Sequence, residues 1–454
     1  MKKRQKTLLA IAMTASVTML AGCAAGGGET ADISYTDSPS GDLRAWGFDN
    51  ADEVGTSRLD YAEEQLKDVS IEIDQTAFDA QKFTTRVASG DVPDVVQMDR
   101  QFVGTYASQE LILPLDECFS AHDVDPDQQY YPSVMDDVTY DGNVWGVPQF
   151  YQPPAIMLNM RVMEAAGVTP EEIDTSQPDV LLAAVQKMYK EAGGNPAVLG
   201  FDPVGVNQAG LWMLGYGGQL IDDEGKPALD DPKNAEAIDF LKQLMDAQGG
   251  YAKVKSFTDS FDVFGDLNPY TADQVGASVF PQWYVNVLTP YVDQVSIGAV
   301  PFRNVDGEPF TVASGTSFVI PAGAKNPDAA CAWMINLTNQ DAWMAAGSAR
   351  AETISSTPGA INTGLFTGSP SADEAIRNEF VTESGNAGFD QTIATFYEVV
   401  GEGESFGASP AGQEIQTELK NAVTSALLGD KTSEEALADA QTASMRAYDK
   451  AVGE

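Results

Sequence analysis

The chain has 454 residues, with 26 Lys and Arg against 67 Asp and Glu, and its formal net charge at pH 7 is −41. This length exceeds what one ordinary hydrophobic core needs, so we expect two domains. The excess of acidic residues excludes nucleic acid and anionic lipid headgroups as partners, because both require a basic protein surface.

Residues 1–22 have the layout of an export signal. Four basic residues among the first six precede the apolar run Thr7–Leu20, which is too short to span a bilayer. The run ends in Leu-Ala-Gly followed by Cys23, which resembles a lipobox, where the cysteine is lipidated and the chain is cut before it. A plain signal peptide with an incidental cysteine is the alternative. Cleavage would leave a net charge of −45, and residues 23–40 have the composition of a flexible tether.

From Gly41 onward the hydrophobic pattern alternates between strands and helices, which indicates an α/β fold. The expected early strands and helices are Leu43–Trp46, Ser57–Lys67, Val69–Ile73, Phe78–Ser89 and Val92–Met98, in that order.

The stretch Tyr140–Pro170 predicts a stiff crossing between two folded halves. A short strand, Val144–Val147, is expected to end at Pro148, and the pair Pro153–Pro154 precedes a second strand, Ala155–Leu158. Proline fixes φ and restricts the residue before it, so this crossing has little freedom. Polar and aromatic side chains at such a crossing are candidates for ligand binding.

The second half of the chain carries several helix-end signals. A helix is expected over Pro178–Glu191, ended by the Gly193–Gly194 pair, and further helices begin after Asp231 and Asn326. Thr432 and Glu435 have the spacing of a capping box for the last helix.

Several motifs, in this order, resemble those of extracellular solute-binding protein family 1, the maltose-binding-protein-like receptors that feed carbohydrate ABC importers. They are PDVVQMD, LILPLDECF, YDGNVWGVP, GASVFPQW, FTVASGTSFVIP and GDKTSEEALADAQ. The resemblance implies an α/β fold of two lobes, periplasmic-binding-protein-like, with a hinge and an interlobe ligand cleft. The implied N-terminal lobe comprises 41–152 plus 308–340, and the C-terminal lobe 153–307 plus 341–454.

The candidate ligand-binding residues combine aromatic platforms with polar groups, because sugars present apolar C–H faces beside dense hydroxyls. Trp283 matches the stacking tryptophan of the family. For Trp46 and Trp212 a core position remains open, and for Asp99 an exposed loop position. The expected set is Trp46, Asp99, Gln149, Tyr151, Trp212, Trp283, Tyr284, Ser314, Gly315 and Asp390.

Metal and disulfide chemistry have weaker signals. Cys118 and Cys331 lack a signature spacing, so we expect two buried free thiols, with a disulfide as the alternative. Asp123, Asp125 and Asp127 alternate like the start of a calcium loop, but Gln128 and Val134 stand where an EF-hand requires Gly and Glu. We therefore expect a solvated acidic turn and no metal or other cofactor.

The implied function is that of a receptor anchored to the outer face of the cell membrane through Cys23. It would capture a carbohydrate, an oligosaccharide above all, by lobe closure and deliver it to the permease of an ABC importer. We expect a monomer without enzymatic activity, since no nucleophile elbow, Walker loop or HExxH pair occurs. A secreted carbohydrate-active enzyme and a binding protein for a non-sugar solute are the alternatives.

Overall fold

The computed structural model describes residues 33–48 and 51–453, so the expected export signal and Cys23 lie outside the described residues. The first sheet has the order β2-β1-β3-β14-β6, with β1 parallel to β2 and β3, and β14 antiparallel to both β3 and β6. Its strands are β1 (Gly41–Trp46), β2 (Val69–Asp74), β3 (Val95–Asp99), β6 (Val147–Tyr151) and β14 (Gly315–Val319).

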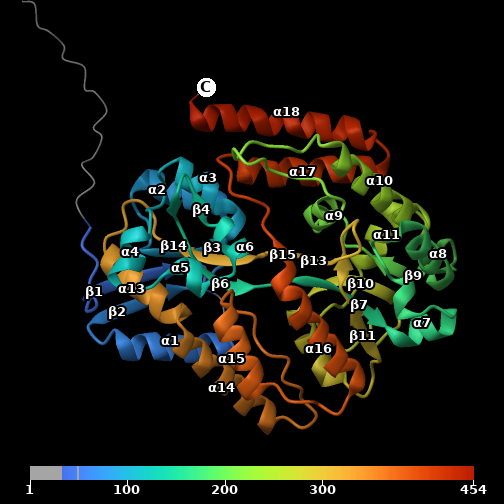
Figure 1. Ribbon diagram of the computed structural model, residues 1–454, viewed down its shortest axis with the longest axis horizontal. Helices are drawn as coiled ribbons and strands as arrows, with labels where there is room; N and C mark the ends of the chain where they lie inside the picture. The colour runs from blue at the N-terminus through green and yellow to red at the C-terminus, as the bar shows by residue number, and fades with distance from the viewer. Residues whose placement is uncertain (1–32, 49–50, 454) are drawn as a thin grey trace, which may run out of the picture. The chain divides into compact units, whose positions relative to one another are not determined.

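Helices cover the first sheet and, with it, form the first lobe (Figure 1). Asp52 begins α1 by accepting a hydrogen bond from the Gly55 N–H at 3.0 Å. Trp333 on α13 is fully buried against Phe48 and Phe318, as expected for a core residue. The helices are α1 (Glu53–Gln65), α2 (Ala80–Ser89), α3 (Val103–Ser108), α4 (Asp116–Ala121), α5 (Pro126–Gln129), α6 (Pro132–Asp136) and α13 (Pro327–Thr338).

The second sheet has the order β11-β7-β10-β9-β8 and is the centre of the second lobe. Its strands are β7 (Pro154–Asn159), β8 (Lys190–Ala192), β9 (Asn195–Asp202), β10 (Val275–Pro281) and β11 (Ile297–Val300). The helices around it are α7 (Met160–Ala166), α8 (Pro178–Met188), α9 (Ala209–Gly215), α10 (Pro232–Asp246), α11 (Tyr251–Thr258) and α12 (Trp283–Leu288).

Several expected element bounds differ from the structure, and the expected strand Val144–Val147 is two separate strands, β5 (Asn143–Val144) and β6. The helix α8 ends at Met188 rather than Glu191, because Lys190–Ala192 leaves the helix and pairs with β9, with Gly193 and Gly194 in the hairpin turn. Pro148 does not end its strand but lies inside β6, opposite Ser317. β6 is an edge strand of the first sheet, and an edge strand tolerates a proline because one side of it carries no ladder hydrogen bonds.

A small sheet connects the two lobes. It consists of β12 (Phe302–Arg303), β13 (Pro309–Val312) and β15 (Gly403–Glu404), in which β13 pairs with both other strands. Thr311 of β13 also donates to the Pro154 carbonyl at 2.8 Å, next to the first crossing. The shorter elements are β4 (Thr139–Tyr140), β5 (Asn143–Val144), η1 (Arg100–Phe102), η2 (Pro170–Glu172), η3 (Thr289–Tyr291) and η4 (Val400–Glu402).

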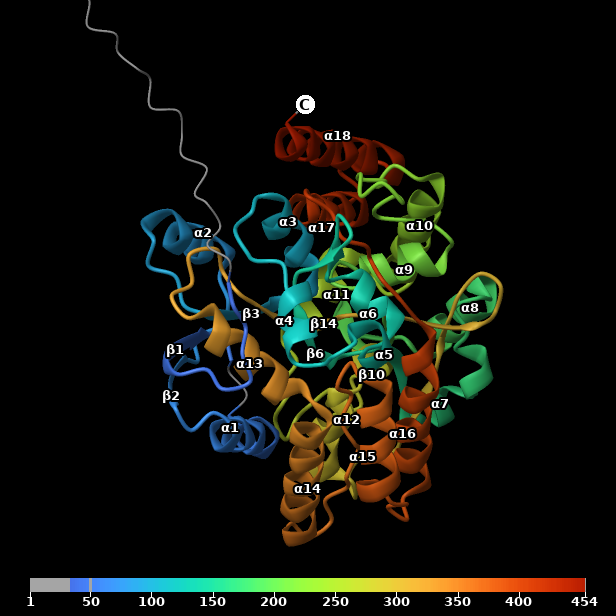
Figure 2. The ribbon, with the colours of Figure 1, turned by 60° about the vertical axis from the view of Figure 1, so that its left-hand side comes forward.

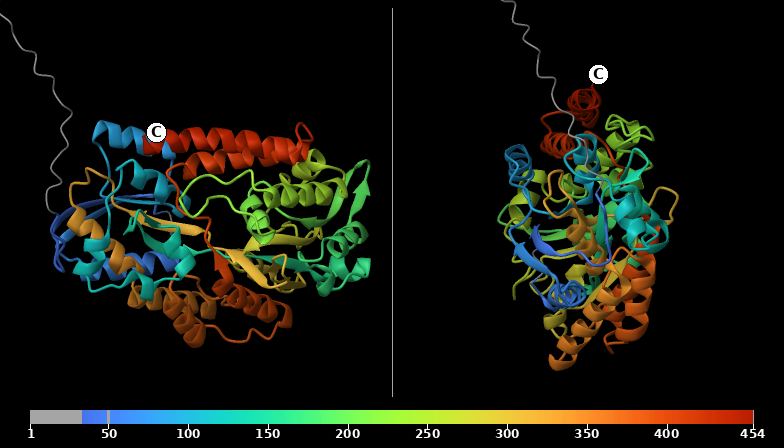
Figure 3. Two further views of the ribbon diagram at one scale, coloured as in Figure 1. Left: turned by 45° about the horizontal axis from the view of Figure 1, so that its top comes forward. Right: turned by 90° about the vertical axis from the view of Figure 1, so that its left-hand side faces the viewer.

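The last third of the chain adds helices to both lobes. α14 (Gln340–Ser356) packs against α1 of the first lobe, with Trp343 fully buried, although the expected lobe boundary placed residues from 341 in the C-terminal lobe (Figure 2). α17 (Gly412–Leu428) and α18 (Ser433–Val452) lie side by side (Figure 3), and the capping box of Thr432 and Glu435 is present. The remaining helices are α15 (Pro370–Phe380) and α16 (Ala387–Val399).

The two described cysteines form a disulfide, so the expectation of free thiols is wrong. Cys118 of α4 and Cys331 of α13 are fully buried, and their Cα atoms lie 5.8 Å apart. The packing of α4 against α13 brings them together. Their sequence separation of 213 residues follows no local pattern, which is why the spacing carries no sign of the pairing.

Candidate functional site

Strand ends from both sheets meet along the crossing between β6 and β7. In the first sheet, Asp99 at the end of β3 is opposite Thr316, and the neighbouring Gly315 is opposite Tyr151 at the end of β6. Three residues after Tyr151, β7 begins at Pro154, which is opposite Pro281 at the end of β10. The register therefore places the carboxyl ends of β3, β6 and β10 in one row. In α/β folds, ligands bind at carboxyl ends of strands.

A hollow of about 570 Å³ opens at this row on the side of the first lobe. It combines three phenyl rings with carboxylate, amide and hydroxyl groups. Its lining residues are Gly47, Ala77, Phe78, Asp79, Ala80, Gln97, Met98, Asp99, Phe102, Phe150, Gln152 and Thr316. Of the expected site residues, only Asp99 lines it. Phe78, Phe102, Phe150 and Gln152 were missed, although each follows or ends a strand that the sequence predicted.

Asp99 is the titratable group at the centre of this hollow. Its side chain is exposed by surface area, yet the concave surroundings desolvate it, and this raises the pKa of its carboxyl above the usual value. The positive charges of Arg100 and of Lys420 on α17 act in the opposite direction. No described residue donates a hydrogen bond to this carboxylate, so its oxygens are available as acceptors for a ligand.

A β-bulge at Phe150 interrupts the alternation of side chains along β6, because the register with β14 shifts between Gln149 and Tyr151. Gln149 and Tyr151, the expected contacts, lie on either side of this bulge and are fully buried. Gln149 accepts a hydrogen bond from Arg58 at 3.0 Å and donates one to Gln97. The neighbours Phe150 and Gln152 line the hollow instead. The expected residues thus lie in the crossing but point into the protein.

Trp283 begins α12, two residues after the end of β10. Its ring is half-buried, and Phe264, which is 69% exposed, lies nearly parallel to it. Tyr284 is fully buried, stacks on Phe280 with ring centroids 3.9 Å apart, and donates to the Val263 carbonyl at 3.2 Å. Of these two expected contacts, only Trp283 presents part of its ring to solvent.

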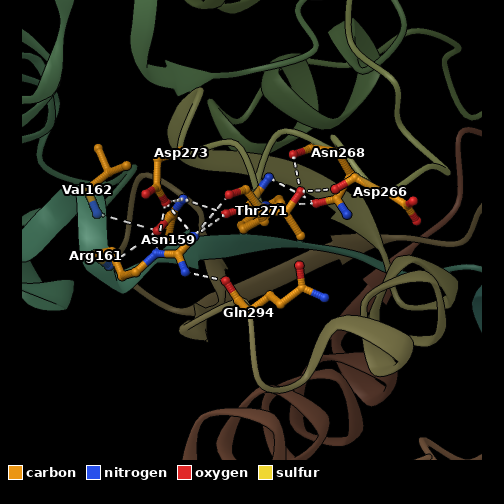
Figure 4. Close-up of polar contacts among 9 residues, drawn as sticks. Asn159, Arg161, Val162, Asp266, Asn268, Thr271, Asp273 and Gln294 are labelled. Atoms are coloured by element: carbon orange, nitrogen blue, oxygen red, sulfur yellow. Dashed lines mark hydrogen bonds and ion pairs between the residues drawn. The ribbon is translucent and has the colours of Figure 1, made fainter.

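Hydrogen bonds from Arg161 and Asn159 hold the end of the loop before β10, which also carries Phe264 (Figure 4). The Arg161 guanidinium donates to Asp273 at 2.8 and 3.0 Å and to the Tyr270 carbonyl at 2.8 Å. Asn159 caps α7 through its side-chain oxygen and donates to Asp273 at 3.0 Å. These contacts fix the loop before β10, and with it the position of Phe264 relative to Trp283.

The other expected residues do not line the hollow, and most of them make contacts within the protein. Trp46 is 1% exposed, with its indole N–H on Thr76 at 3.1 Å, and Trp212 is fully buried with its indole N–H on the Pro203 carbonyl at 3.2 Å. Asp390 accepts hydrogen bonds from the Ser384 N–H and hydroxyl at 2.8 and 2.7 Å. Ser314 and Gly315 are half-buried beside the hollow, and the Ser314 carbonyl accepts from the Gln152 N–H at 2.8 Å.

A second hollow, of about 610 Å³, lies among residues 136–141, 214–225 and 405–408. It is lined by five carboxylates, including Asp222, Asp223 and Glu224. Within 33–48 and 51–453, however, no group of three or more His, Cys, Asp or Glu side chains is arranged to hold a metal ion, and this includes the Asp123–Asp127 turn. The hollow at Asp99 lies at the carboxyl ends of strands of the first sheet and combines three phenyl rings with hydrogen-bonding groups, so we take it as the candidate site.

Comparisons with known proteins agree with this architecture. An ABC transporter solute-binding protein from Thermotoga lettingae, bound to α-D-tagatose, is 20% identical, covers 90% of this chain and 100% of its own, and has a TM-score of 0.69. An ABC substrate-binding protein from Listeria monocytogenes in complex with cycloalternan is 16% identical, and its TM-score is also 0.69. The match covers 91% of this chain and 99% of the Listeria protein. The fold is therefore that of the two-lobe periplasmic binding proteins, with a hinge and an interlobe cleft.

The chain belongs to the bacterial extracellular solute-binding protein family, whose model matches residues 54–342. The arabinooligosaccharide-binding protein of Bacillus subtilis is 24% identical over 200 residues, which are 42% of this chain and 43% of that protein. The chain thus spans less than half the length of the curated relatives it matches. In the part of the chain that the structure describes, no helix has the length and apolarity to cross a membrane.

Proposed function

We propose that this protein captures a carbohydrate, an oligosaccharide above all, in the interlobe cleft and delivers it to an ABC import permease. The observation that carries this proposal is the hollow at Asp99, where Phe78, Phe102 and Phe150 surround polar groups. Flat rings suit the C–H faces of a sugar, and carboxylate and amide groups suit its hydroxyls. The sugars named for the Bacillus, Thermotoga and Listeria proteins support a carbohydrate as the solute.

Capture works by lobe closure in this proposal. A solute that contacts both lobes only in the closed form shifts the equilibrium toward that form, which the permease then recognises. Asp99 and Gln152 would supply the first-lobe contacts, and Trp283 the stacking surface of the second lobe. In this proposal the first lobe comprises 41–152 and 308–340 together with α14, which packs against α1, and the second lobe comprises the rest of 153–454.

The carboxylates of the hollow support binding rather than hydrolysis. Glycosidases need two carboxyl groups on either side of the scissile bond. Of the two carboxylates that line the hollow, Asp79 accepts a hydrogen bond from the Lys82 N–H at 2.6 Å and caps α2. The Asp79 carboxylate is thus engaged by the helix backbone, whereas no described residue donates a hydrogen bond to Asp99, so the two carboxylates differ in role.

A thermal-shift screen tests the proposed solute. The panel is tagatose, arabinotriose, mannobiose, maltotriose and an amino-acid mixture, and each incubation is followed by chromatography of the solute. A sugar at 100 times its Kd should stabilise the protein by about 2.7 kcal/mol and be recovered intact. Recovery of shorter products would indicate an enzyme, and a response to amino acids alone would exclude a carbohydrate receptor. A steep fall in affinity between low and physiological ionic strength would indicate a charged solute.

The membrane anchor in this proposal is lipidated Cys23, which lies outside the described residues. Cys23→Ser should yield a precursor that is neither acylated nor cut before residue 23, as mass spectrometry of the membrane fraction would show. Thr30→Ser, in the expected tether, leaves the lipobox intact and serves as the matched control. A membrane-bound, acylated Cys23→Ser protein would contradict the anchor.

A further inference from the structure

One buried guanidinium contacts two of the segments that join the lobes. Arg100, directly after Asp99, is 1% exposed. Its Nη1 donates to the Phe150 carbonyl at 2.9 Å, at the end of β6, and to the Thr316 carbonyl at 3.2 Å. Its Nη2 donates to the Ala313 carbonyl at 2.5 Å, at the end of β13. Arg100 therefore joins the β6–β7 crossing to the β13–β14 crossing.

The partner of Arg100 extends this contact to a third segment. Asp137 is 3% exposed and lies 3.3 Å from the Arg100 Nε through Oδ2. Its other oxygen, Oδ1, accepts a hydrogen bond from the Ser405 hydroxyl at 2.5 Å, directly after β15. The Ser405 oxygen in turn accepts from the Gly407 N–H at 2.8 Å. The β6–β7 crossing, the β13–β14 crossing and the segment after β15 are thus connected through the Arg100–Asp137 pair, and we call them the three hinge segments.

The backbone around this pair is closely packed. A Cβ on Gly315 would come within 2.1 Å of the Phe150 carbonyl and 2.5 Å of the Arg100 Nη1. A Cβ on Gly403, next to β13, would come within 1.6 Å of the Tyr151 hydroxyl. Phe150 itself has a φ of +39°, a strained value for a residue with a side chain, and its carbonyl is the one held by Arg100. The three segments therefore have little room to shift independently.

We propose that Arg100 and Asp137 are positioning residues of the cleft: they hold the three hinge segments in one arrangement and so limit the range over which the lobes open. The proposal rests on the function proposed above, since the opening of the lobes sets the fraction of protein that is competent to bind. A wider range of open states lowers this fraction and weakens the apparent affinity in proportion.

The test measures the distance between the lobes without any solute. Spin labels at Ser89→Cys on α2 and Glu191→Cys on β8, both exposed positions, report this distance by double electron–electron resonance in the full chain with Cys23→Ser. Asp137→Asn removes the charge paired with Arg100. Ser405→Ala removes only the hydrogen bond that links Asp137 to the segment after β15. Both should broaden the distance distribution at a temperature where each variant is folded, and Ser405→Thr should restore it by returning the hydroxyl.

Asp136→Asn is the matched control, because Asp136 is exposed and has no contact with Arg100, and its distribution should equal that of the wild type. Arg100→Lys keeps the positive charge but loses the guanidinium N–H groups that donate to three carbonyls, and it should also broaden the distance distribution. Unchanged distributions in folded Asp137→Asn and Ser405→Ala overturn the proposal.

An affinity measurement with arabinotriose and mannobiose as probes separates this proposal from the proposed function. If the wild type binds a probe, Asp137→Asn should weaken that binding several-fold. If the wild type binds neither, the proposed solute fails, while the distance distributions still decide the role of Arg100 and Asp137.

Discussion

Phe264 lies almost parallel to Trp283, with ring centroids 5.9 Å apart and 15° between the ring planes. Phe264 is largely exposed, Trp283 is half-buried, and both lie next to the end of β10. Stiff aromatic side chains in such positions order around a ligand at little entropic cost. The pair gives the second lobe an aromatic surface at the row of strand ends.

Trp283→Ala should weaken carbohydrate binding by about tenfold to a hundredfold, which corresponds to about 1–3 kcal/mol. The melting temperature without solute should change little, because the ring is only half-buried. Trp212→Ala is the matched control, since that ring is fully buried and its loss should cost about 3–5 kcal/mol of folding stability. Calorimetric titration and thermal unfolding of the same preparations measure both quantities. Unchanged affinity with a large loss of stability in Trp283→Ala would contradict the assignment.

The two glutamines of the crossing should respond differently to truncation. Gln152→Ala should weaken binding by roughly tenfold and leave stability within about 0.5 kcal/mol, because its side chain lines the hollow. Gln149→Ala should cost about 1–3 kcal/mol of stability, because it removes the buried hydrogen bonds that its amide makes with Arg58 and Gln97. Urea unfolding and calorimetric titration check both. Equal effects of the two changes on affinity would show that the burial of Gln149 does not keep it from the ligand.

Loss of the Cys118–Cys331 disulfide should lower the free energy of unfolding by about 2–5 kcal/mol. The bond closes a long loop between α4 and α13, so its removal enlarges the unfolded ensemble. The double change Cys118→Ala and Cys331→Ala, compared with wild type in urea, measures this. Thiol titration of the denatured wild type provides the control. Two titratable thiols in the unreduced, denatured protein with Cys23→Ser would show that the bond does not form.

Asp373 should make stability depend on pH. Burial raises the pKa of its carboxyl from 3.8 to about 7, although Thr367 donates two hydrogen bonds to it at 2.7 Å. Between pH 4 and 7 the folded protein thus holds a proton that the unfolded chain releases. Stability from this group is therefore full at low pH and is lost as pH rises toward 7, by at most about 1.4 kcal/mol per pH unit.

Asp373→Asn should flatten this part of the stability profile, whereas Glu374→Gln, at the exposed neighbouring position, should leave it unchanged. Urea unfolding from pH 4 to 8 measures the slope in each variant. Parallel profiles for wild type and Asp373→Asn would show that the buried carboxyl does not titrate in this range.

The α/β class and several helix starts could be predicted because their signals are local. Asn326, for example, caps α13 by accepting from the Ala329 N–H at 3.2 Å, within one helical turn. The site was harder to predict. Positions 149 to 152 were identified as the crossing, but which of them face the hollow depends on the pairing of β6 with β14, and β14 lies more than 160 residues later in the chain.

By itself, the sequence determined the class of fold, several capped helix starts and the motifs that mark the family. These follow from hydrophobic period and helix caps, which depend on residues within a few positions of each other. Only the tertiary structure decided the pairing of Cys118 with Cys331, the burial of Trp46 and Trp212, and the connection of three hinge segments through Arg100. The physical reason is that these features are contacts between distant segments, and such contacts form only when both lobes are packed.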